Sequence, residues 1–148
     1  MRPAGLVNDQ PLWSGSCHCG AIRVALRTAL RCADLQPRAC DCSFCVQHGA
    51  AWVSDPAGSL ALECSDRTAL HPYRQGSGQA LFLWCGRCGV LLAAMHEDGT
   101  RQYGAVNARC LDRYGELGAA QVVSPQRLSA DEKVRRWARI WTPVTRIG

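Results

Sequence analysis

The spacing of the cysteines constrains this 148-residue chain more than any other feature. Seven of its ten cysteines fall in three short clusters, Cys17-x-Cys19, Cys40-x-Cys42-x-x-Cys45 and Cys85-x-x-Cys88. Two cysteines that are one residue apart cannot adopt the geometry of an unstrained disulfide. The opening "MRPAGLVNDQPLW" lacks the apolar run of a secretory signal. We therefore expect a cytoplasmic protein with reduced thiols, which favours metal binding or catalysis over disulfides.

Composition indicates one folded domain over residues 1–148, because hydrophobic residues make up 47% of the chain and charged residues 20%. No apolar run is long enough to cross a membrane. The formal charge of +5 comes from sixteen arginines and Lys133. These residues are scattered along the chain, and seven thiolates with two zinc ions would lower the charge to about +2. Nucleic acid is therefore not a favoured partner.

Short segments separated by turns predict a mainly β fold with antiparallel sheets, either a sandwich or a partly closed barrel. Residues 21–28 alternate apolar and polar side chains, which is typical of a half-buried strand. The tetrapeptide Asp55-Pro56-Ala57-Gly58 suits a type I turn, and Asp98-Gly99 suits a hairpin turn with positive φ angles. The other expected strands lie within residues 51–54, 59–63, 79–85, 90–96 and 101–107.

A single short helix is expected near the C-terminus. Ser129 and Glu132 have the spacing of a capping box, and Pro143 should end the helix. The residues predicted to share its apolar face are Val134, Trp137, Ala138 and Trp141.

The Cys85-x-x-Cys88-Gly89 motif is typical of a zinc knuckle, in which two cysteines span a tight turn and the following glycine takes the left-handed conformation. A knuckle supplies two ligands, whereas structural zinc requires four. Cys17 and Cys19 could complete the tetrahedron, with Gly20 in the role of Gly89. The long intervening segment is no obstacle, because loop-closure entropy grows only logarithmically with length.

This pairing leaves Cys40, Cys42 and Cys45 as a compact group of three ligands. Catalytic zinc commonly has three protein ligands and leaves its fourth position to water or substrate. A closed structural site is the alternative, with His48 as the fourth ligand, although an exposed or neighbouring position is the favoured interpretation of His48. The ligand count thus suggests one structural and one reactive metal.

The segments "GSCHCGAIRV", "ACDCSFCVQHGA" and "LWCGRCGVLL", together with "AVNARCLD", resemble the glutathione-dependent formaldehyde-activating enzyme family, which includes centromere protein V. The resemblance spans about residues 13–112. It implies a β-tent fold with two Zn²⁺ ions, a structural one on Cys17, Cys19, Cys85 and Cys88 and a second one on the other three. At the second zinc, glutathione and formaldehyde would combine to S-(hydroxymethyl)glutathione, which is carbon–sulfur lyase chemistry. Asp41 and Val46 depart from the usual residues of relatives beside this site.

Arg38 and Arg109 are candidates for holding carboxylates of the substrate, because a guanidinium matches a carboxylate with two hydrogen bonds. The remaining cysteines, histidines and tryptophans receive structural interpretations. Cys32, Cys64 and Cys110 are expected to be buried as small hydrophobic residues. No catalytic role is expected for His18, His71 and His96. Core or rim positions are expected for Trp13, Trp52 and Trp84.

Three other functional classes are weighed against the enzyme. The first is a non-catalytic binding module stabilised by two structural zinc sites. A nucleic-acid-binding zinc ribbon is disfavoured, because its knuckles lie much closer together in sequence than Cys19 and Cys85 do. A thiol redox protein is disfavoured too, because neither C-x-x-C motif opens a helix within a βαβ unit.

Overall fold

The structure is a computed structural model, which describes residues 10–148. Its strands are β1 (Leu12–Ser16), β2 (Ile22–Arg27), β3 (Arg38–Cys40), β4 (Trp52–Val53), β5 (Ser59–Cys64), β6 (Leu70–Tyr73), β7 (Leu81–Cys85), β8 (Leu91–Asp98), β9 (Arg101–Asn107), β10 (Gln121–Val123) and β11 (Thr142–Ile147). Its α-helices are α1 (Ser43–His48) and α2 (Ala130–Ile140). Neither has the length and apolar character that crossing a bilayer requires.

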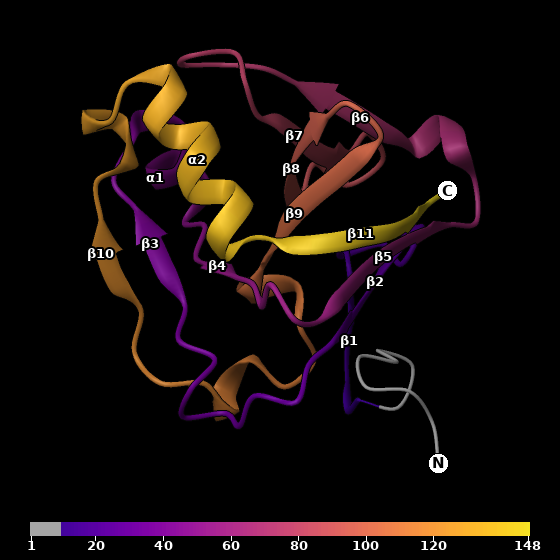
Figure 1. Ribbon diagram of the computed structural model, residues 1–148. Coiled ribbons are helices and arrows are strands. Elements are labelled where there is room, and N and C mark those ends of the chain that lie inside the picture. The colour runs from indigo at the N-terminus through magenta and orange to yellow at the C-terminus, as the bar shows by residue number, and fades with distance from the viewer. Residues whose placement is uncertain (1–9) are drawn as a thin grey trace.

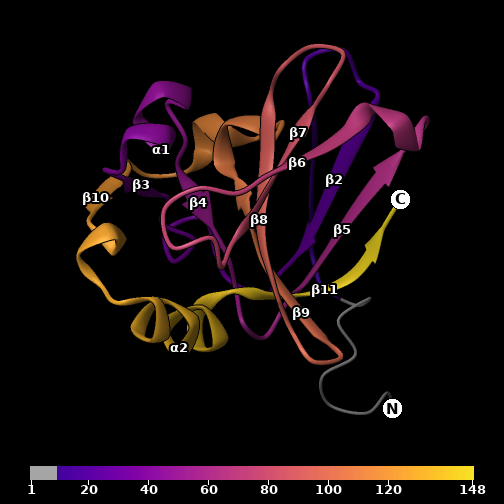
Figure 2. The ribbon, with the colours of Figure 1, turned by 90° about the horizontal axis from the view of Figure 1, so that it is seen from above.

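The strands form one branched sheet in which β8 and β9 occupy the centre (Figures 1 and 2). One path runs in the order β1-β2-β5-β11-β9-β4-β3-β10, and a second continues from β9 through β8 and β7 to β6. The mainly β fold with a short C-terminal helix confirms the expected class. The sheet is mixed, however, because β11 pairs with β5 and β10 pairs with β3 in parallel.

The β8–β9 hairpin separates two hydrophobic cores. On one side it packs against β1, β2 and β5, with Ile22, Leu62 and Leu92 among the buried residues. On the other side its Leu91 and Ala94 face a second core, which contains residues from α1, β4 and α2. Figure 2 displays this arrangement, with β2 and β5 on one side of the hairpin and α1, β4 and α2 on the other. Six consecutive residues at the start of β8 are therefore buried, because both faces of the strand are covered.

The hairpin turn lies one residue later than the sequence predicts. Asp98 pairs with Arg101, so Gly99 and Thr100 form the two-residue loop. Gly99 has φ +61°, whereas Asp98 remains in the strand with negative φ. A loop with glycine in the first position needs only one positive φ, and this explains the shift. The turn at residues 55–58 is confirmed by the bond from the Gly58 N–H to the Asp55 carbonyl, 2.9 Å.

Helix α2 begins where the sequence predicts, with both bonds of the Ser129–Glu132 capping box present. It ends at Ile140, shortly before Pro143. Its buried face is rotated from the predicted one, because Ala138 is exposed while Ile140 is half-buried. The packing of Trp137 and Trp141, which stack at 4.5 Å between ring centroids, fixes this rotation.

The three isolated cysteines do not behave alike. Cys110 is buried, as expected, and its thiol donates to the Leu91 carbonyl at 3.4 Å. Cys32 and Cys64 are only half-buried, so the prediction of buried positions is wrong for them. Cys32 lies in an irregular segment and Cys64 at the end of β5, where the core cover is incomplete. Trp13 and Trp52 are buried and Trp84 is half-buried, which confirms their core and rim positions.

Two cysteine clusters as candidate metal centres

The first cluster is built by two similar turns. Cys17 follows β1, and Cys85 ends β7, so each turn leads into the next antiparallel strand. In one turn the Cys17 N–H donates to the Ile22 carbonyl at 3.0 Å, and in the other the Cys85 N–H donates to the Val90 carbonyl at 2.9 Å. The glycine after the second cysteine has φ +81° in the first turn and +82° in the second. Both turns thus have the left-handed glycine of a knuckle.

The two turns bring four sulfur atoms together. All four Sγ atoms, from Cys17, Cys19, Cys85 and Cys88, lie within 4.8 Å of one another. The Sγ atom of Cys19 is 3.7 Å from that of Cys17 and 3.7 Å from that of Cys85. Zinc–sulfur bonds of about 2.3 Å in a tetrahedron place the sulfurs about 3.8 Å apart. The donor set and its spacing therefore fit tetrahedral zinc.

Backbone N–H groups also stabilise negative charge in this cluster. The Ile22 N–H points to the Cys17 sulfur at 3.4 Å. Desolvation opposes ionisation of Cys88, but the N–H groups of Cys19 and Val90, together with hydrogen bonds from the Cys85 and Cys17 thiols, outweigh it and lower the pKa of this thiol to about 6. A thiolate is the form that binds a metal, so these contacts favour metal binding at neutral pH.

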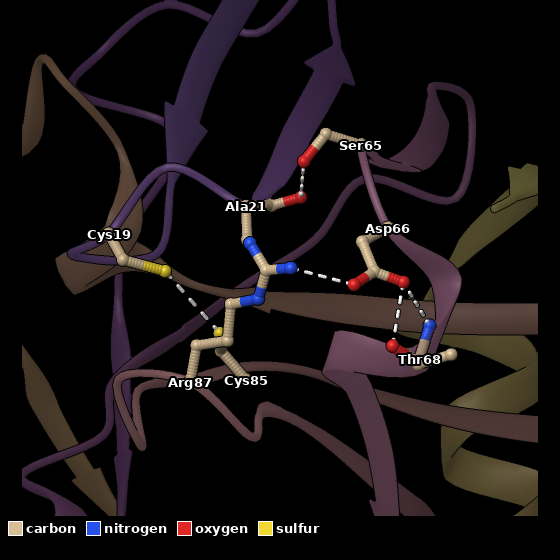
Figure 3. A network of polar contacts seen from close by, with 7 residues as sticks. All are labelled: Cys19, Ala21, Ser65, Asp66, Thr68, Cys85 and Arg87. Carbon is tan, nitrogen blue, oxygen red and sulfur yellow. Dashed lines mark hydrogen bonds and ion pairs between the residues drawn. The ribbon is translucent and has the colours of Figure 1, made fainter.

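An exposed polar network attaches the second turn to the neighbouring loop (Figure 3). Arg87 lies within the turn, and its guanidinium donates to the Asp66 carboxylate at 2.7 Å. That carboxylate also accepts the Thr68 N–H at 3.0 Å and the Thr68 hydroxyl at 2.6 Å. Because Asp66 precedes the 3₁₀ helix η2 (Arg67–Ala69), it caps this helix and holds the turn at the same time.

The second cluster is formed by a strand end and the first turn of a helix. Cys40 ends β3, Cys42 is the N-cap of α1, and Cys45 lies in the first turn of the helix, where it is 2% exposed. The Cys42 sulfur accepts the Cys45 N–H at 3.4 Å, as a capping side chain does. The three Sγ atoms lie within 4.8 Å of one another, so this donor set also fits a soft metal such as zinc, with three ligands from the chain. The hydrogen bond from Cys45 lowers the pKa of Cys40 to about 6.

The segment that contains β10 holds the second cluster from outside. The Asp41 N–H donates to the Val123 carbonyl at 3.0 Å. The Asp41 carboxylate accepts hydrogen bonds from the Ser124 hydroxyl and, at 3.0 Å, from the Gln126 amide. Asp41, which stands between two of the sulfurs in sequence, is thereby tied to a distant segment. On the inner side, the Gln75 amide lies 3.9 Å from the Cys42 sulfur.

A cavity of about 80 Å³ lies against the second cluster. Its walls are made of three sulfurs, three cations, aromatic rings and small apolar side chains. The lining residues are Arg38, Cys40, Cys42, Cys45, Trp52, Gln75, Ala80, Phe82, Ala94, Val123, Pro125, Lys133, Arg136, Trp137 and Trp141. No aspartate or glutamate within residues 10–148 lines this cavity. It therefore offers soft donors and positive charge in a partly apolar setting.

Two of the three cations that line the cavity are guanidinium groups. Arg38 donates to the Ser54 hydroxyl at 2.8 Å, and burial together with the charge of Arg136 lowers its pKa to about 10. Burial also lowers the pKa of Arg136, while the Cys40 thiolate opposes this shift. Within residues 10–148, neither guanidinium lies within 4.0 Å of a carboxylate oxygen. Two cations thus stand close together at the cavity without an acidic partner in this part of the chain.

The structure separates the two arginines that the sequence suggests as substrate-binding residues. Arg38 lines the cavity of the second cluster. Arg109 lies elsewhere, where it donates to the Gly49 carbonyl at 3.1 Å and covers the Tyr114 ring. His48 is exposed at the end of α1, packs against Phe44 and lies outside the group of three sulfurs. It therefore occupies the exposed position favoured for it and not a ligand position.

Sequence reasoning missed the contribution of α2 to this site. Lys133 and Arg136 carry charge on the same side of the helix as Trp137, which is buried. Cations beside the apolar face of an amphipathic helix are a signal that could have identified them. The remaining histidines do not line this cavity. His18 and His71 are exposed, and the ring of His96 hydrogen-bonds with the Gln79 carbonyl at 2.7 Å.

Most of the chain matches a known protein family. Residues 12–127 match the family model described as glutathione-dependent formaldehyde-activating enzyme. The chain belongs to this family. The match extends beyond the residues that carry the sequence resemblance, and it includes all seven clustered cysteines.

A solved structure has the same fold as this member of the formaldehyde-activating family. It is the crystal structure of a protein from Rhodobacter sphaeroides, which is 26% identical to this chain. The superposition has a TM-score of 0.58 and covers 74% of this chain and 99% of the other. Helix α2 begins at Ala130, beyond the last residue of the family match.

Proposed function

We propose that this protein is a zinc-dependent enzyme that joins a thiol, with glutathione as the first candidate, to a small aldehyde such as formaldehyde. The supporting observation is that the three sulfurs of Cys40, Cys42 and Cys45 line a cavity, and that this cavity carries positive charge. The four sulfurs of the first cluster would hold a structural zinc, since they complete the tetrahedron without an outside ligand.

The chemistry requires a deprotonated thiol. A zinc ion on the three cysteines would supply a position that favours the thiolate form of the substrate at neutral pH. The sulfur attacks the carbonyl carbon of the aldehyde, a C–S bond forms, and the electron pair of the C=O π bond moves to oxygen. That oxygen takes up one proton, which balances the proton lost by the thiol and yields a hydroxymethyl thioether.

Residues of the chain would orient the reactants around this step. The guanidinium groups of Arg38 and Arg136 face the cavity without an acidic partner in the described residues, so they can bind a carboxylate of the thiol substrate. The Gln75 amide lies beside Cys42 and can donate to the aldehyde oxygen as negative charge develops on it. The aromatic walls, which include Trp52 and Trp137, limit the access of water to the thiolate.

Thermal unfolding with two forms of glutathione tests whether sulfur is recognised. Glutathione should raise the melting temperature of the zinc-loaded protein, and S-methylglutathione should raise it less, because its capped sulfur is a poor zinc ligand. At a hundredfold excess over the dissociation constant, binding stabilises the folded state by about 2.7 kcal/mol. Equal shifts for the two compounds, or no shift for either, would contradict a sulfur-binding metal.

The rate of adduct formation tests catalysis. With glutathione and formaldehyde present, the protein should form S-(hydroxymethyl)glutathione faster than the uncatalysed reaction. Cys45→Ser should remove this excess, whereas Cys64→Ser, a change at a half-buried cysteine outside both clusters, should retain it. If wild type and Cys45→Ser give the same rate, the second cluster is structural and the protein is a binding module with two structural zinc sites.

A further inference from the structure

The cavity wall formed by α2 lies outside the residues that the family model matches. Four lining residues, Lys133, Arg136, Trp137 and Trp141, follow residue 127 in the chain. Trp137 and Trp141 are each 7% exposed and stack with an interplanar angle of 10°, so this wall is well packed. The capping box and the C-cap bond from the Trp141 N–H to the Trp137 carbonyl hold the helix in place. This wall of the site is therefore built from residues that follow the family match.

The α2 wall contributes two of the three cations that give the cavity an excess of positive charge. Three thiolates and one divalent zinc ion together carry a single negative charge. The three positive charges of Arg38, Lys133 and Arg136 outnumber this negative charge. They still outnumber the negative charges when the carboxylate of Asp41, which lies outside the cavity, is counted as well. The guanidinium of Arg38 has one neutral partner, Ser54, whose hydroxyl in turn donates to the Ile140 carbonyl at 2.6 Å. Charge complementarity therefore favours the binding of an anionic group in the cavity, in addition to the sulfur that the metal would bind.

The volume of the cavity limits the size of that anion. A dry cavity of about 150 Å³ accommodates benzene, and the space beside the second cluster is about 80 Å³. It therefore encloses only part of a ligand of the size of glutathione. Glutathione carries its thiol on the central residue, and amide bonds separate this residue from both carboxylates. A sulfur and a carboxylate that enter such a space together must be joined by a very short chain.

We propose that this site selects a short thiol acid, in which one or two methylene groups separate the thiol from a carboxylate, and that Arg136 with Arg38 binds the carboxylate. This inference rests on the proposed function, since it places the thiol at the second cluster. It identifies α2 as the element that determines specificity, with Lys133 as a further positive charge and Trp137 as the wall that limits length. Glutathione would reach the metal only with most of its atoms outside the cavity.

Calorimetric titration of the zinc-loaded protein with four thiols tests this selectivity. We expect 3-mercaptopropionate to bind about tenfold more tightly than 2-mercaptoethanol, because it adds a charge-assisted bidentate contact. It should also bind more tightly than glutathione and than cysteamine, which carries a positive charge. Equal affinities for 3-mercaptopropionate and 2-mercaptoethanol, or tighter binding of glutathione, would overturn the proposal.

Variants of α2 assign the selectivity to Arg136. Arg136→Gln should remove most of the advantage of 3-mercaptopropionate and leave the affinity for 2-mercaptoethanol unchanged. Arg135→Gln is the matched control, because Arg135 is exposed, does not line this cavity and should leave both affinities unchanged. An unchanged preference in Arg136→Gln would overturn the role of α2.

Titration with propionate separates this inference from the proposed function. Propionate lacks sulfur, so it should bind more weakly than 3-mercaptopropionate, and its binding should depend on Arg136. If propionate and 3-mercaptopropionate bind equally and Arg136→Gln weakens both, sulfur recognition and the proposed function fail while carboxylate recognition stands. If thiols bind irrespective of charge, the proposed function stands and the selectivity fails.

Discussion

The two cysteine clusters lie on opposite sides of the β8–β9 hairpin, and each belongs to a different hydrophobic core. In the first, two knuckle turns supply four sulfurs, and Cys17 and Cys85 are among the buried residues of the larger core. In the second, a strand end and a short helix supply three sulfurs beside a cavity. Cysteine sulfurs therefore form two different kinds of cluster. Four sulfurs complete the coordination of a tetrahedral metal, whereas three sulfurs leave one position for another ligand.

Serine substitutions should separate the two clusters most strongly. Cys85→Ser should leave little folded protein, because structural zinc contributes about 10–16 kcal/mol, as much as the whole stability of a typical domain. Cys42→Ser should retain a cooperative unfolding transition and lose one zinc. Circular dichroism during thermal unfolding, with zinc analysis of the same samples, measures both effects. If Cys42→Ser unfolds the chain as completely as Cys85→Ser does, the clusters have the same structural role.

Removal of the α2 wall should have the next largest effect. Trp137→Ala leaves a cavity in the second core, where Trp137 stacks on Trp141 and lies 5.5 Å from the His96 ring. Such truncations cost about 3 kcal/mol or more, which urea unfolding can measure. The control Arg139→Ala changes an exposed residue of the same helix and should have little effect. Comparable losses in the two variants would mean that α2 does not pack as described.

The knuckle conformation should be sensitive to side chains at its left-handed glycine. Gly89→Ala places an alanine at φ +82°, although its Cβ would meet no atom within 4 Å. The cost is therefore conformational, about 1–2 kcal/mol. Gly115→Ala is the control, since its Cβ also meets no atom and its φ is not positive. Equal melting temperatures for the two variants would show that the turn does not require this conformation.

The smallest effect is expected at the exposed network beside the first cluster. The Thr68 hydroxyl and N–H, with Arg87, hold the pKa of Asp66 below its usual value. Because the folded pKa is lowered, this stabilisation exists above the unfolded pKa and is lost as the pH falls through the folded pKa. Asp66→Asn should lower the melting temperature slightly at neutral pH and low salt. A difference from wild type that persists in acid and in high salt would argue against this electrostatic cause.

Local sequence predicted the features whose geometry depends on few residues. The two turns with Gly20 and Gly89 bring their sulfurs together as the knuckle motif indicates. The capping box was sufficient to predict the start of α2, and the alternation of apolar and polar residues was sufficient to predict β2. Each of these patterns depends on residues of a single element. The hairpin turn at Gly99 was misplaced by one residue, since Asp-Gly and Gly-Thr loops are both compatible with that stretch.

Features that depend on distant segments were not predictable from local pattern. Strands β3 and β10 have three residues each, too few for an alternation to show. Within residues 10–148, β10 pairs with β3 alone, and β3 pairs with β10 and β4. Strand β11 forms parallel pairs with β5 across a long stretch of chain. The cationic wall was missed for a related reason. Whether Arg136 faces solvent or the cavity depends on how α2 packs, and stacking of two tryptophans determines that packing.

Zinc counting during chelation tests the difference between the clusters most directly. The protein should contain two zinc ions, and a strong chelator should remove one of them while the circular dichroism spectrum stays native. The zinc of the first cluster should leave only as the protein unfolds, because its four sulfurs and the larger core form one unit. Release of both ions in a single step with loss of the fold, or a total of one ion per chain, would contradict this account.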